Sequence, residues 1–203
     1  THVYGEWEVV TAATTEHGGL RKRYCACGDE QSEPIPKLTR TVYDFNGTDI
    51  NADVTTDGIN PFKASKVTDL STVPSGYDGD VYSKSSNNLV CIGIGLGDKA
   101  YNLDDLLEMK IKLMVVSDKK MPKGNVRIYD DTNNKIYGDK NFDSDLSGVY
   151  DEWIEIDLLP LLKESVAMTD TLTKNGVLKN FSLVIRTGVD ATVYFDRLTV
   201  ISK

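Results

Sequence analysis

The stretch that decides the fold class is Leu89-Val90-Cys91-Ile92-Gly93-Ile94-Gly95-Leu96. Large apolar side chains alternate there with small ones, and successive side chains of a β-strand point to opposite faces of the sheet. The even-numbered residues of this stretch therefore share one face, which we expect to contact a core, and the two glycines lie on the other face. The pattern predicts a β-strand rather than a helix.

The same alternation recurs along most of the chain. It is found at residues 109–115, 126–129, 153–158, 181–186 and 191–195. Only residues 161–174, after Pro160, are expected to form a helix of any length, with a further helical turn at residues 103–107. Because many short strands occur without regularly alternating helices, we predict an all-β fold, an antiparallel β-sandwich.

The first 37 residues differ from the rest. Two strand-like runs, residues 7–10 and 20–28, flank the turn-forming pair Gly18-Gly19, which predicts a β-hairpin. An isolated hairpin is marginally stable in water, and Pro34-Ile35-Pro36 is typical of a boundary or a stiff linker. We therefore predict a small N-terminal β-hairpin appendage over residues 1–37 and a sandwich over residues 38–203.

The charge of the chain excludes some partners. Its 203 residues carry a formal net charge of −8, whereas a nucleic-acid-binding surface needs a basic stripe that neutralises phosphates. No apolar run approaches the roughly 20 residues that span a bilayer, so we predict no membrane insertion. The first five residues have neither the basic start nor the apolar core of a signal peptide, and we expect other domains of the same parent chain beside this one.

Three cysteines, Cys25, Cys27 and Cys91, exclude a fully paired disulfide framework within the chain because their number is odd. A bridge between Cys25 and Cys27, two residues apart on a strand, would be strained. We therefore expect free thiols. A zinc site of His17, Cys25 and Cys27 lacks a fourth ligand and the usual paired spacing, and it is not predicted.

Residues 41–203 resemble the jelly-roll carbohydrate-binding modules that have a galactose-binding-like fold. The matching pieces are residues 43–47, 106–113, 151–158 and 191–198, with Trp153 opening an isoleucine-rich strand and Asp196 near the end of the chain. The resemblance implies a jelly roll that binds carbohydrate without cleaving it. It also implies a structural Ca²⁺ between the first and last strands, for which Asp44 and Asp196 would supply the oxygen ligands.

Residues 2–37 resemble the short repeats found in tandem on large surface proteins of Gram-positive bacteria. The resemblance rests on Tyr4-Gly5-Glu6-Trp7, the Gly18-Gly19 turn and Arg23-Tyr24-Cys25-Ala26-Cys27-Gly28. Many such repeats carry another cysteine near the position of Thr14 or Thr15. The resemblance implies an extracellular setting, secreted or attached to the cell wall.

Signals of catalysis are absent from the sequence. The only histidines, His2 and His17, lie in the appendage, and no nucleophile elbow, zinc-protease motif or phosphate loop occurs. Glu155 and Asp157 share a strand face and could form the carboxylate pair of a glycosidase, but among 31 acidic residues such pairs arise by chance. We predict no catalytic residues and no enzyme.

Sugar binding needs a flat aromatic ring that stacks on a pyranose and polar groups that bind its hydroxyls. With the apolar residues inward, alternation places a set of aromatic and polar residues on the outward faces of the sheets. We predict five ligand-binding residues for a neutral polysaccharide or oligosaccharide: Trp153, Tyr129, Arg186, Lys112 and Glu155. The side-chain-free Gly93 and Gly95 would leave room for the ligand on such a face.

Two alternatives remain open at the level of sequence. Trp153 could serve packing, and the tyrosines near loops favour a site at the loop tips instead: Tyr77, Tyr82, Tyr101, Tyr137 and Tyr150. The chain could also be an adhesion or structural spacer module that binds protein or no ligand, because one fold serves many functions.

Overall fold

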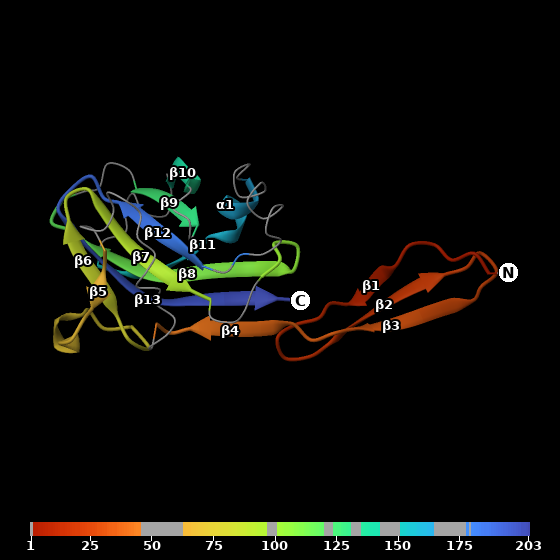
Figure 1. The fold of residues 1–203 in the computed structure, drawn as a ribbon. Coiled ribbons are helices and arrows are strands. Elements are labelled where there is room, and N and C mark those ends of the chain that lie inside the picture. The colour runs from red at the N-terminus through yellow and green to blue at the C-terminus, as the bar shows by residue number, and fades with distance from the viewer. Residues whose placement is uncertain are drawn as a thin grey trace.

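The computed structural model describes residues 2–45, 63–96, 101–119, 124–130, 135–142, 151–164, 178 and 180–203. The strands in these ranges form three sheets (Figure 1). One sheet has the order β1-β2-β3, a second β10-β9-β12-β7 and a third β11-β8-β13-β6-β5, with β4 also paired to β13. Strand pairing is antiparallel throughout these sheets, which confirms the predicted all-β antiparallel sandwich.

The N-terminal sheet is a three-stranded arm that projects from one end of the sandwich (Figure 1). Its strands are β1 (Glu8–Thr11), β2 (Gly19–Tyr24) and β3 (Glu30–Ile35). The predicted hairpin is the β1–β2 pair, and the third strand was not predicted because its sequence is polar and contains Pro34. Since β3 is an edge strand, a proline without an N–H group is tolerated there.

Gly19 shows why the turn between β1 and β2 needs glycine. A Cβ atom at this position would lie 2.3 Å from the carbonyl oxygen of Thr11 and 2.6 Å from the nitrogen of Ala13, both backbone atoms. A side chain at position 19 would overlap these backbone atoms, so the two segments can approach this closely only because residue 19 is glycine.

The arm is held together without a hydrophobic core, since none of residues 2–38 is buried. The guanidinium carbon atoms of Arg21 and Arg23 lie 4.9 and 4.7 Å from the centre of the Trp7 ring, and that of Arg23 also lies 5.0 Å from the Tyr4 ring. Arg21 further donates to Glu33 Oε2 at 2.9 Å. Cation–π contacts of this kind contribute about 0.5–1 kcal/mol each at exposed sites, so stacked rings and guanidinium groups replace the missing core.

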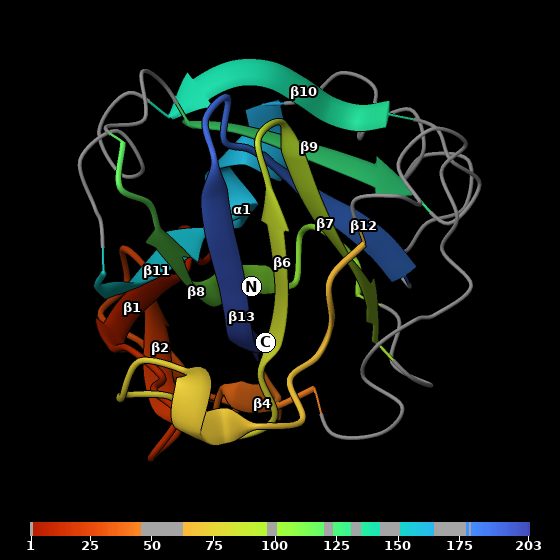
Figure 2. The same cartoon turned by 90° about the vertical axis from the view of Figure 1, so that its left-hand side faces the viewer.

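The sandwich consists of the four-stranded and the six-stranded sheets, whose apolar faces meet (Figure 2). The strands of the first are β7 (Leu89–Gly95), β9 (Gly124–Asp130), β10 (Lys135–Phe142) and β12 (Asn180–Arg186). Those of the second are β4 (Thr39–Tyr43), β5 (Ser65–Lys66), β6 (Tyr82–Ser86), β8 (Leu106–Val116), β11 (Trp153–Asp157) and β13 (Ala191–Ser202).

The deciding stretch forms β7 as predicted. Val90, Ile92, Ile94 and Leu96 are all at most 1% exposed and belong to the shared core. They pack with the large buried side chains of the opposite sheet, among them Ile111, Leu113 and Phe195. Burying such a side chain contributes about 1.5–3 kcal/mol, so this alternation supplies much of the driving force for the sandwich.

The predicted helix begins earlier than expected: α1 runs from Leu159 to Glu164, and residues 165–174 of the prediction lie outside the described residues. Asp157 Oδ1 accepts from the nitrogen of Leu159 at 3.0 Å, which caps the start of the helix before Pro160. Residues 103–105 form a turn, and β8 begins at Leu106 directly after it. A short 3₁₀ helix, η3 (Leu70–Thr72), lies in the connection between β5 and β6.

The strand β13 joins the two ends of the sandwich. Its first half pairs with β6 and its second half with β4, the strand that directly follows the arm. The end of the sandwich near Ala191 is therefore the one farthest from the arm. Within the described residues, no helix has the length and apolar character needed to cross a membrane.

Candidate functional site

A β-bulge in β13 creates a charged outward surface on the six-stranded sheet. Phe195 pairs with Leu113 and Arg197 with Lys112, so Asp196 is an extra residue between two consecutive pairs. A bulge of this kind changes the alternation of side chains along a strand. As a result Phe195 and Leu198 both enter the core, and Arg197 lies opposite Lys112 on the outward face.

Lys112 is at the centre of this surface. Its Nζ atom lies 2.8 Å from Asp196 Oδ2 and 3.3 Å from Asp78 Oδ2, and it donates to the carbonyl oxygen of Gly76 at 2.5 Å. The Lys112 side chain is 12% exposed and that of Asp196 is 1% exposed. The other carboxylate oxygen of Asp196 accepts from the backbone nitrogen of Asp78 at 3.2 Å, so a buried ion pair fastens the 75–78 segment to the sheet.

Trp153 stands beside Lys112, because it pairs with Met114 on the neighbouring strand. The ammonium group of Lys112 lies 5.3 Å from the centre of the indole ring. The indole nitrogen donates to the carbonyl oxygen of Ser75 at 3.0 Å, and a Cβ atom on Gly76 would come within 2.9 Å of the ring. Trp153 is thus half-buried, with part of its ring covered by the segment that carries Ser75 and Gly76.

The rim of the surface consists of the exposed residues Glu155 and Asp78 and, between them, Arg197, whose side chain is only 22% exposed. Glu155 pairs with Lys112 across β11 and β8, and Lys112 pairs with Arg197 across β8 and β13. Arg197 forms ion pairs with Asp78 and, at 3.8 Å, with Glu155, whose side chains are 60% and 47% exposed. Donors and acceptors therefore alternate at the solvent boundary beside an indole ring. We call these residues the bulge-face cluster: Lys112, Trp153, Glu155, Asp196, Arg197 and Asp78.

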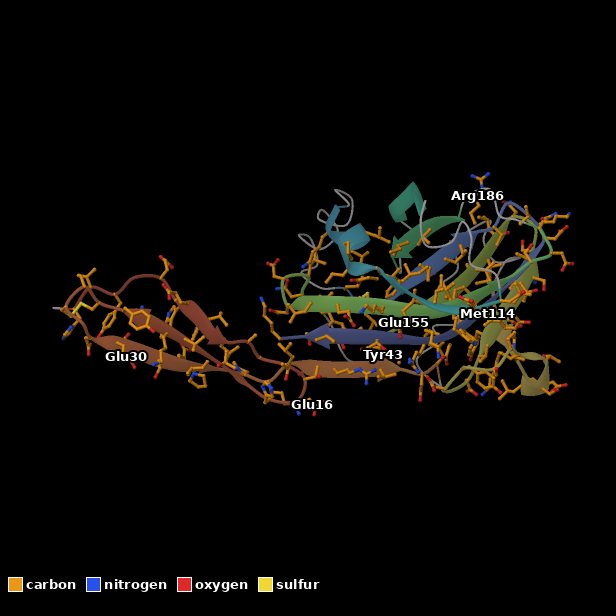
Figure 3. All side chains as sticks on the ribbon, turned by 180° about the vertical axis from the view of Figure 1, so that it is seen from behind. Glu16, Glu30, Tyr43, Met114, Glu155 and Arg186 are labelled. Carbon is orange, nitrogen blue, oxygen red and sulfur yellow. A yellow bond between two sulfur atoms is a disulfide. The ribbon has the colours of Figure 1, made fainter. Side chains whose placement is uncertain are left out.

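The structure brings three of the five predicted ligand-binding residues together, namely Trp153, Lys112 and Glu155. The other two lie on the opposite sheet: Arg186 is exposed at the end of β12, and Tyr129 lies on β9 (Figure 3). One ligand-binding surface on the six-stranded sheet cannot include these two.

The outward side of the four-stranded sheet is covered at the glycines expected to leave room for a ligand. Gly93 and Gly95 are buried, and so are Ser182 and Val184 on the neighbouring strand. The room expected beside the glycines is therefore not open to solvent.

The carboxylates suggested for glycosidase chemistry have other roles. Asp157 is bound to backbone nitrogens, at 3.0 Å to Leu159 and 3.4 Å to Met109, and so serves the turn into α1. Glu155 faces Arg197 instead.

Comparisons with known proteins match only at the level of structure. No family model matches the chain, and no curated protein matches it. A crystal structure of domains CD of another protein is 14% identical, covers 92% of this chain and 76% of that one, and has a TM-score of 0.47. SGBP-B from a complex xyloglucan utilization locus in Bacteroides uniformis is 15% identical, covers 92% of this chain and has a TM-score of 0.40; the matched part spans 56% of SGBP-B.

A structure on the promiscuous specificity of carbohydrate-binding modules from the β-sandwich superfamily is 12% identical. It covers 89% of this chain and 71% of that one, with a TM-score of 0.37. The all-β description of the chain rests on its own strands and not on these similarities.

Of the two residues expected to bind calcium, Asp196 has a counter-ion of its own. Its buried carboxylate lies 2.8 Å from the Lys112 ammonium. Within the described residues, Asp44 and Asp196 do not belong to a group of three acidic, cysteine or histidine ligands close enough to share an ion. A Ca²⁺ ion takes six to eight oxygen ligands, so calcium here would need further oxygens from backbone carbonyl groups, amide side chains or water.

A polar hollow, separate from the bulge-face cluster, lies at the end of the sandwich farthest from the arm. It has a volume of about 400 Å³ and is lined mainly by hydroxyl, amide and carboxylate side chains, including Ser85, Asn87, Asp118, Asp190 and Thr192. Among the residues that the structure describes, no aromatic one lines it. Of the loop tyrosines, Tyr77 and Tyr82 are half-buried, Tyr101 is buried and hydrogen-bonded to Tyr43 at 2.9 Å, and Tyr150 and the side chain of Tyr137 lie outside the described residues.

Sequence reasoning missed Asp78 and Arg197. Strict alternation from Val193 and Phe195 would place Arg197 in the core, and only the bulge moves it to the outward face. A charged pair, Asp196-Arg197, within an otherwise apolar strand is the signal that could have indicated a bulge. Asp78 belongs to a loop whose position over the sheet has no periodic signature.

Proposed function

We propose that the chain is a non-catalytic carbohydrate-binding module that binds a neutral glycan on the bulge-face cluster. The observation that carries the proposal is the convergence of Trp153, Lys112 and Glu155, nominated from alternation alone, on one outward face of the six-stranded sheet. An indole ring beside alternating donors and acceptors meets the two needs of sugar recognition, which are contact with the apolar ring face and hydrogen bonds to hydroxyls.

Binding would use the exposed rim and leave the buried pair intact. The carboxylates of Glu155 and Asp78 accept from sugar hydroxyls, and the guanidinium of Arg197 donates to them. Lys112 and Asp196 remain paired underneath and hold the rim in place. Because the rim contains both charges and the chain has a net charge of −8, a neutral glycan is favoured over an anionic one.

The experiment titrates the folded chain with each member of a panel of neutral oligosaccharides and measures the heat of binding by calorimetry. The panel includes a xylogluco-oligosaccharide and dextran fragments. Glu155→Ala removes an exposed acceptor without touching the core, and we expect affinity to fall by about 10- to 150-fold, because a hydrogen bond to a charged group contributes about 1.5–3 kcal/mol. Glu108→Ala, on the same sheet and paired with Lys110 at 2.7 Å, is the matched control and should bind normally.

A third variant separates the two possible surfaces. Asn87→Ala alters the hollow at the far end of the sandwich and leaves the bulge-face cluster unchanged. Loss of binding in Asn87→Ala with normal binding in Glu155→Ala would move the site to the loop tips. A folded chain that binds no member of the panel would refute carbohydrate binding.

We propose an extracellular setting for the module, as part of a larger secreted or cell-wall-attached bacterial protein, with residues 1–37 and 38–203 as separate domains. Cys25 and Cys27 form a disulfide in the structure, contrary to the free thiols expected from the sequence, and this bond supports an extracellular setting because disulfides persist in oxidising compartments. Calcium ligation by Asp44 and Asp196 stays a prediction. If calcium is bound there, a chelator should lower the melting temperature of the chain, and an unchanged melting curve would exclude a structural ion.

An adhesion or spacer function is the second candidate, and the arm favours it. A three-stranded sheet without buried residues that extends from the sandwich increases the reach of the chain (Figure 1). This alternative predicts that no glycan changes the melting temperature, whereas a ligand that binds the folded state raises it by mass action.

A further inference from the structure

The N-terminus lies at the end of the arm farthest from the sandwich (Figure 1), and there one side chain of the N-terminal segment meets two of the β2–β3 turn, all three of types that can ligate a metal. The Nδ1 atom of His2 and the Sγ atoms of Cys25 and Cys27 all lie within 4.8 Å of one another, and His2 Nδ1 is 3.1 Å from Cys27 Sγ. We propose that these three residues form a zinc site when the two cysteines are reduced.

The spacing of the three atoms suits a tetrahedral ion. Zinc binds thiolate sulfur at about 2.3 Å and imidazole nitrogen at about 2.0–2.1 Å, so its ligand atoms lie roughly 3.3–3.8 Å apart in a tetrahedron. The three ligand atoms lie within 4.8 Å of one another, so once reduction has separated the two bonded sulfurs, a shift of about one ångström brings them into this range. His2 is exposed and Cys27 lies in an exposed turn, so both side chains can make that shift without disturbing a core.

The backbone of the turn holds the two cysteines close together. The nitrogen of Cys27 donates to Cys25 Sγ at 3.3 Å, so a backbone N–H group points at one of the two sulfurs. The turn is closed by Cys25 N–H to Asp29 and Gly28 N–H to Cys25, both at 2.9 Å. Gly28 has φ of 88°, a conformation that glycine adopts readily, and a side chain there would meet open space.

Asp29 offers a fourth ligand. Its Oδ2 atom is 3.7 Å from His2 Nδ1 and accepts from the hydroxyl of Tyr4. Either this carboxylate or a water molecule would complete the coordination. His17, the histidine of the zinc site that the sequence did not support, lies instead in the turn between β1 and β2, where its Nδ1 is 3.3 Å from the carbonyl oxygen of Gly18.

Metal binding and the disulfide exclude each other. In the structure Cys25 and Cys27 are bonded, which corrects the expectation that they are free thiols; the turn brings their Cα atoms to 5.1 Å, closer than on an extended strand. A thiol reductant opens the bond: two molecules of reductant become one disulfide, and the chain gains two thiols. Each thiol then releases one proton to solvent as its sulfur binds zinc.

The opening costs little in chain entropy, because the bridge closes a loop of only a few residues and disulfides that close short loops restrict the unfolded chain least. The arm tip therefore has two alternative crosslinks, a disulfide under oxidising conditions and a metal under reducing ones.

The test titrates the full chain with Co²⁺ and then Zn²⁺, without oxygen, after a phosphine reductant has produced three free thiols per chain. We expect one Co²⁺ per chain, with the thiolate-to-cobalt charge-transfer band and strong visible bands of tetrahedral cobalt, and displacement by Zn²⁺. Cys27→Ser should remove the charge-transfer band and weaken Zn²⁺ binding by more than about 100-fold, because even a residue behind a ligand contributes about 10- to 100-fold.

The two histidines provide a matched pair of variants. His2→Ala should weaken Zn²⁺ binding, whereas His17→Ala and Cys91→Ser should bind as the unaltered chain does. All of these except Cys91→Ser are changes in the arm, so the melting curve of the sandwich should be unaffected. Absence of cobalt binding by the reduced chain, or equal zinc affinity of His2→Ala and His17→Ala, would overturn the proposal.

Discussion

Replacing Lys112 with methionine tests whether the ion pair under the bulge-face cluster holds the fold. The ammonium lies 2.8 Å from a carboxylate that is 1% exposed, and at an effective dielectric constant near 20 their attraction is about 6 kcal/mol. Desolvation offsets part of this attraction, and measured losses on removing one partner of a buried pair are about 3–5 kcal/mol. Since Asp196 keeps its bond from the nitrogen of Asp78, we expect the lower end, about 3 kcal/mol.

The matched control is Lys110→Met, two residues earlier on the same strand. Lys110 pairs with Glu108 at 2.7 Å, but their side chains are 34% and 28% exposed, and surface pairs contribute about 0–1 kcal/mol. The hydrogen bond from Lys110 to Glu108 raises the pKa of Lys110, so that lysine is charged at neutral pH and the comparison is fair.

Urea unfolding followed by circular dichroism measures both variants, with the free energy taken by linear extrapolation. The double variant Lys112→Met/Asp196→Asn should lose at least about 1 kcal/mol less than the sum of the single variants, because each single change leaves the other group without its partner. Equal losses in Lys112→Met and Lys110→Met, or strict additivity in the double variant, would refute a buried pair at this position.

Three further predictions concern packing and titration. Trp7→Ala should speed amide exchange of β2 by about one to two orders of magnitude, because two cation–π contacts are lost, while Tyr24→Ala, 48% exposed, should change it little. Gly76→Ala should destabilise the sandwich by about 2 kcal/mol or more, since φ is 108° and the new Cβ meets the indole ring at 2.9 Å; Gly188→Ala, with φ of 65° and open space, should cost only about 1 kcal/mol. Burial raises the pKa of Cys91 to about 11, so its contribution to stability is complete below the usual thiol pKa and is lost as pH rises through 11. Thermal melts between pH 8 and pH 12 should therefore fall more steeply for the unaltered chain than for Cys91→Ala, and parallel curves would count against this burial.

Alternation of apolar residues predicted the sandwich because it is a direct consequence of strand geometry. It correctly placed Val90, Ile92, Ile94 and Leu96 in the core and Lys112 and Glu155 on the outward face. It failed at Arg197, since one extra residue in β13 reverses the alternation and no periodic pattern announces a bulge. It also failed at β3, whose residues are too polar for strand formation to be evident without a partner strand beside them.

The site was predictable only in part for the same reason. Trp153 and Lys112 could be placed on a common face from the pattern, but the segment containing Ser75, Gly76 and Asp78 packs on them through backbone atoms, which any sequence could supply. The arm tip depends on a turn that joins His2 to Cys27, two residues 25 positions apart. Contacts between loops and termini are long-range, and periodicity carries no information about them.

The arm and the sandwich are stabilised by different physics, and this difference decides where each proposed function can act. The sandwich is held together by a shared core, so a ligand on its outward face raises its melting temperature by mass action but is not needed to hold its strands together. The arm buries no residue and depends on stacked guanidinium groups, ion pairs and one crosslink at its tip. A change from disulfide to metal at that tip therefore acts on the arm alone, because the disulfide crosslinks a single turn whereas a metal would also tie His2 to that turn. Zinc should raise the exchange protection of β2 and β3 in the reduced chain, while the sandwich keeps its melting temperature. If reduction and zinc change amide exchange in β8 and β13 as much as in β2 and β3, the arm and the sandwich are one cooperative unit and this separation is wrong.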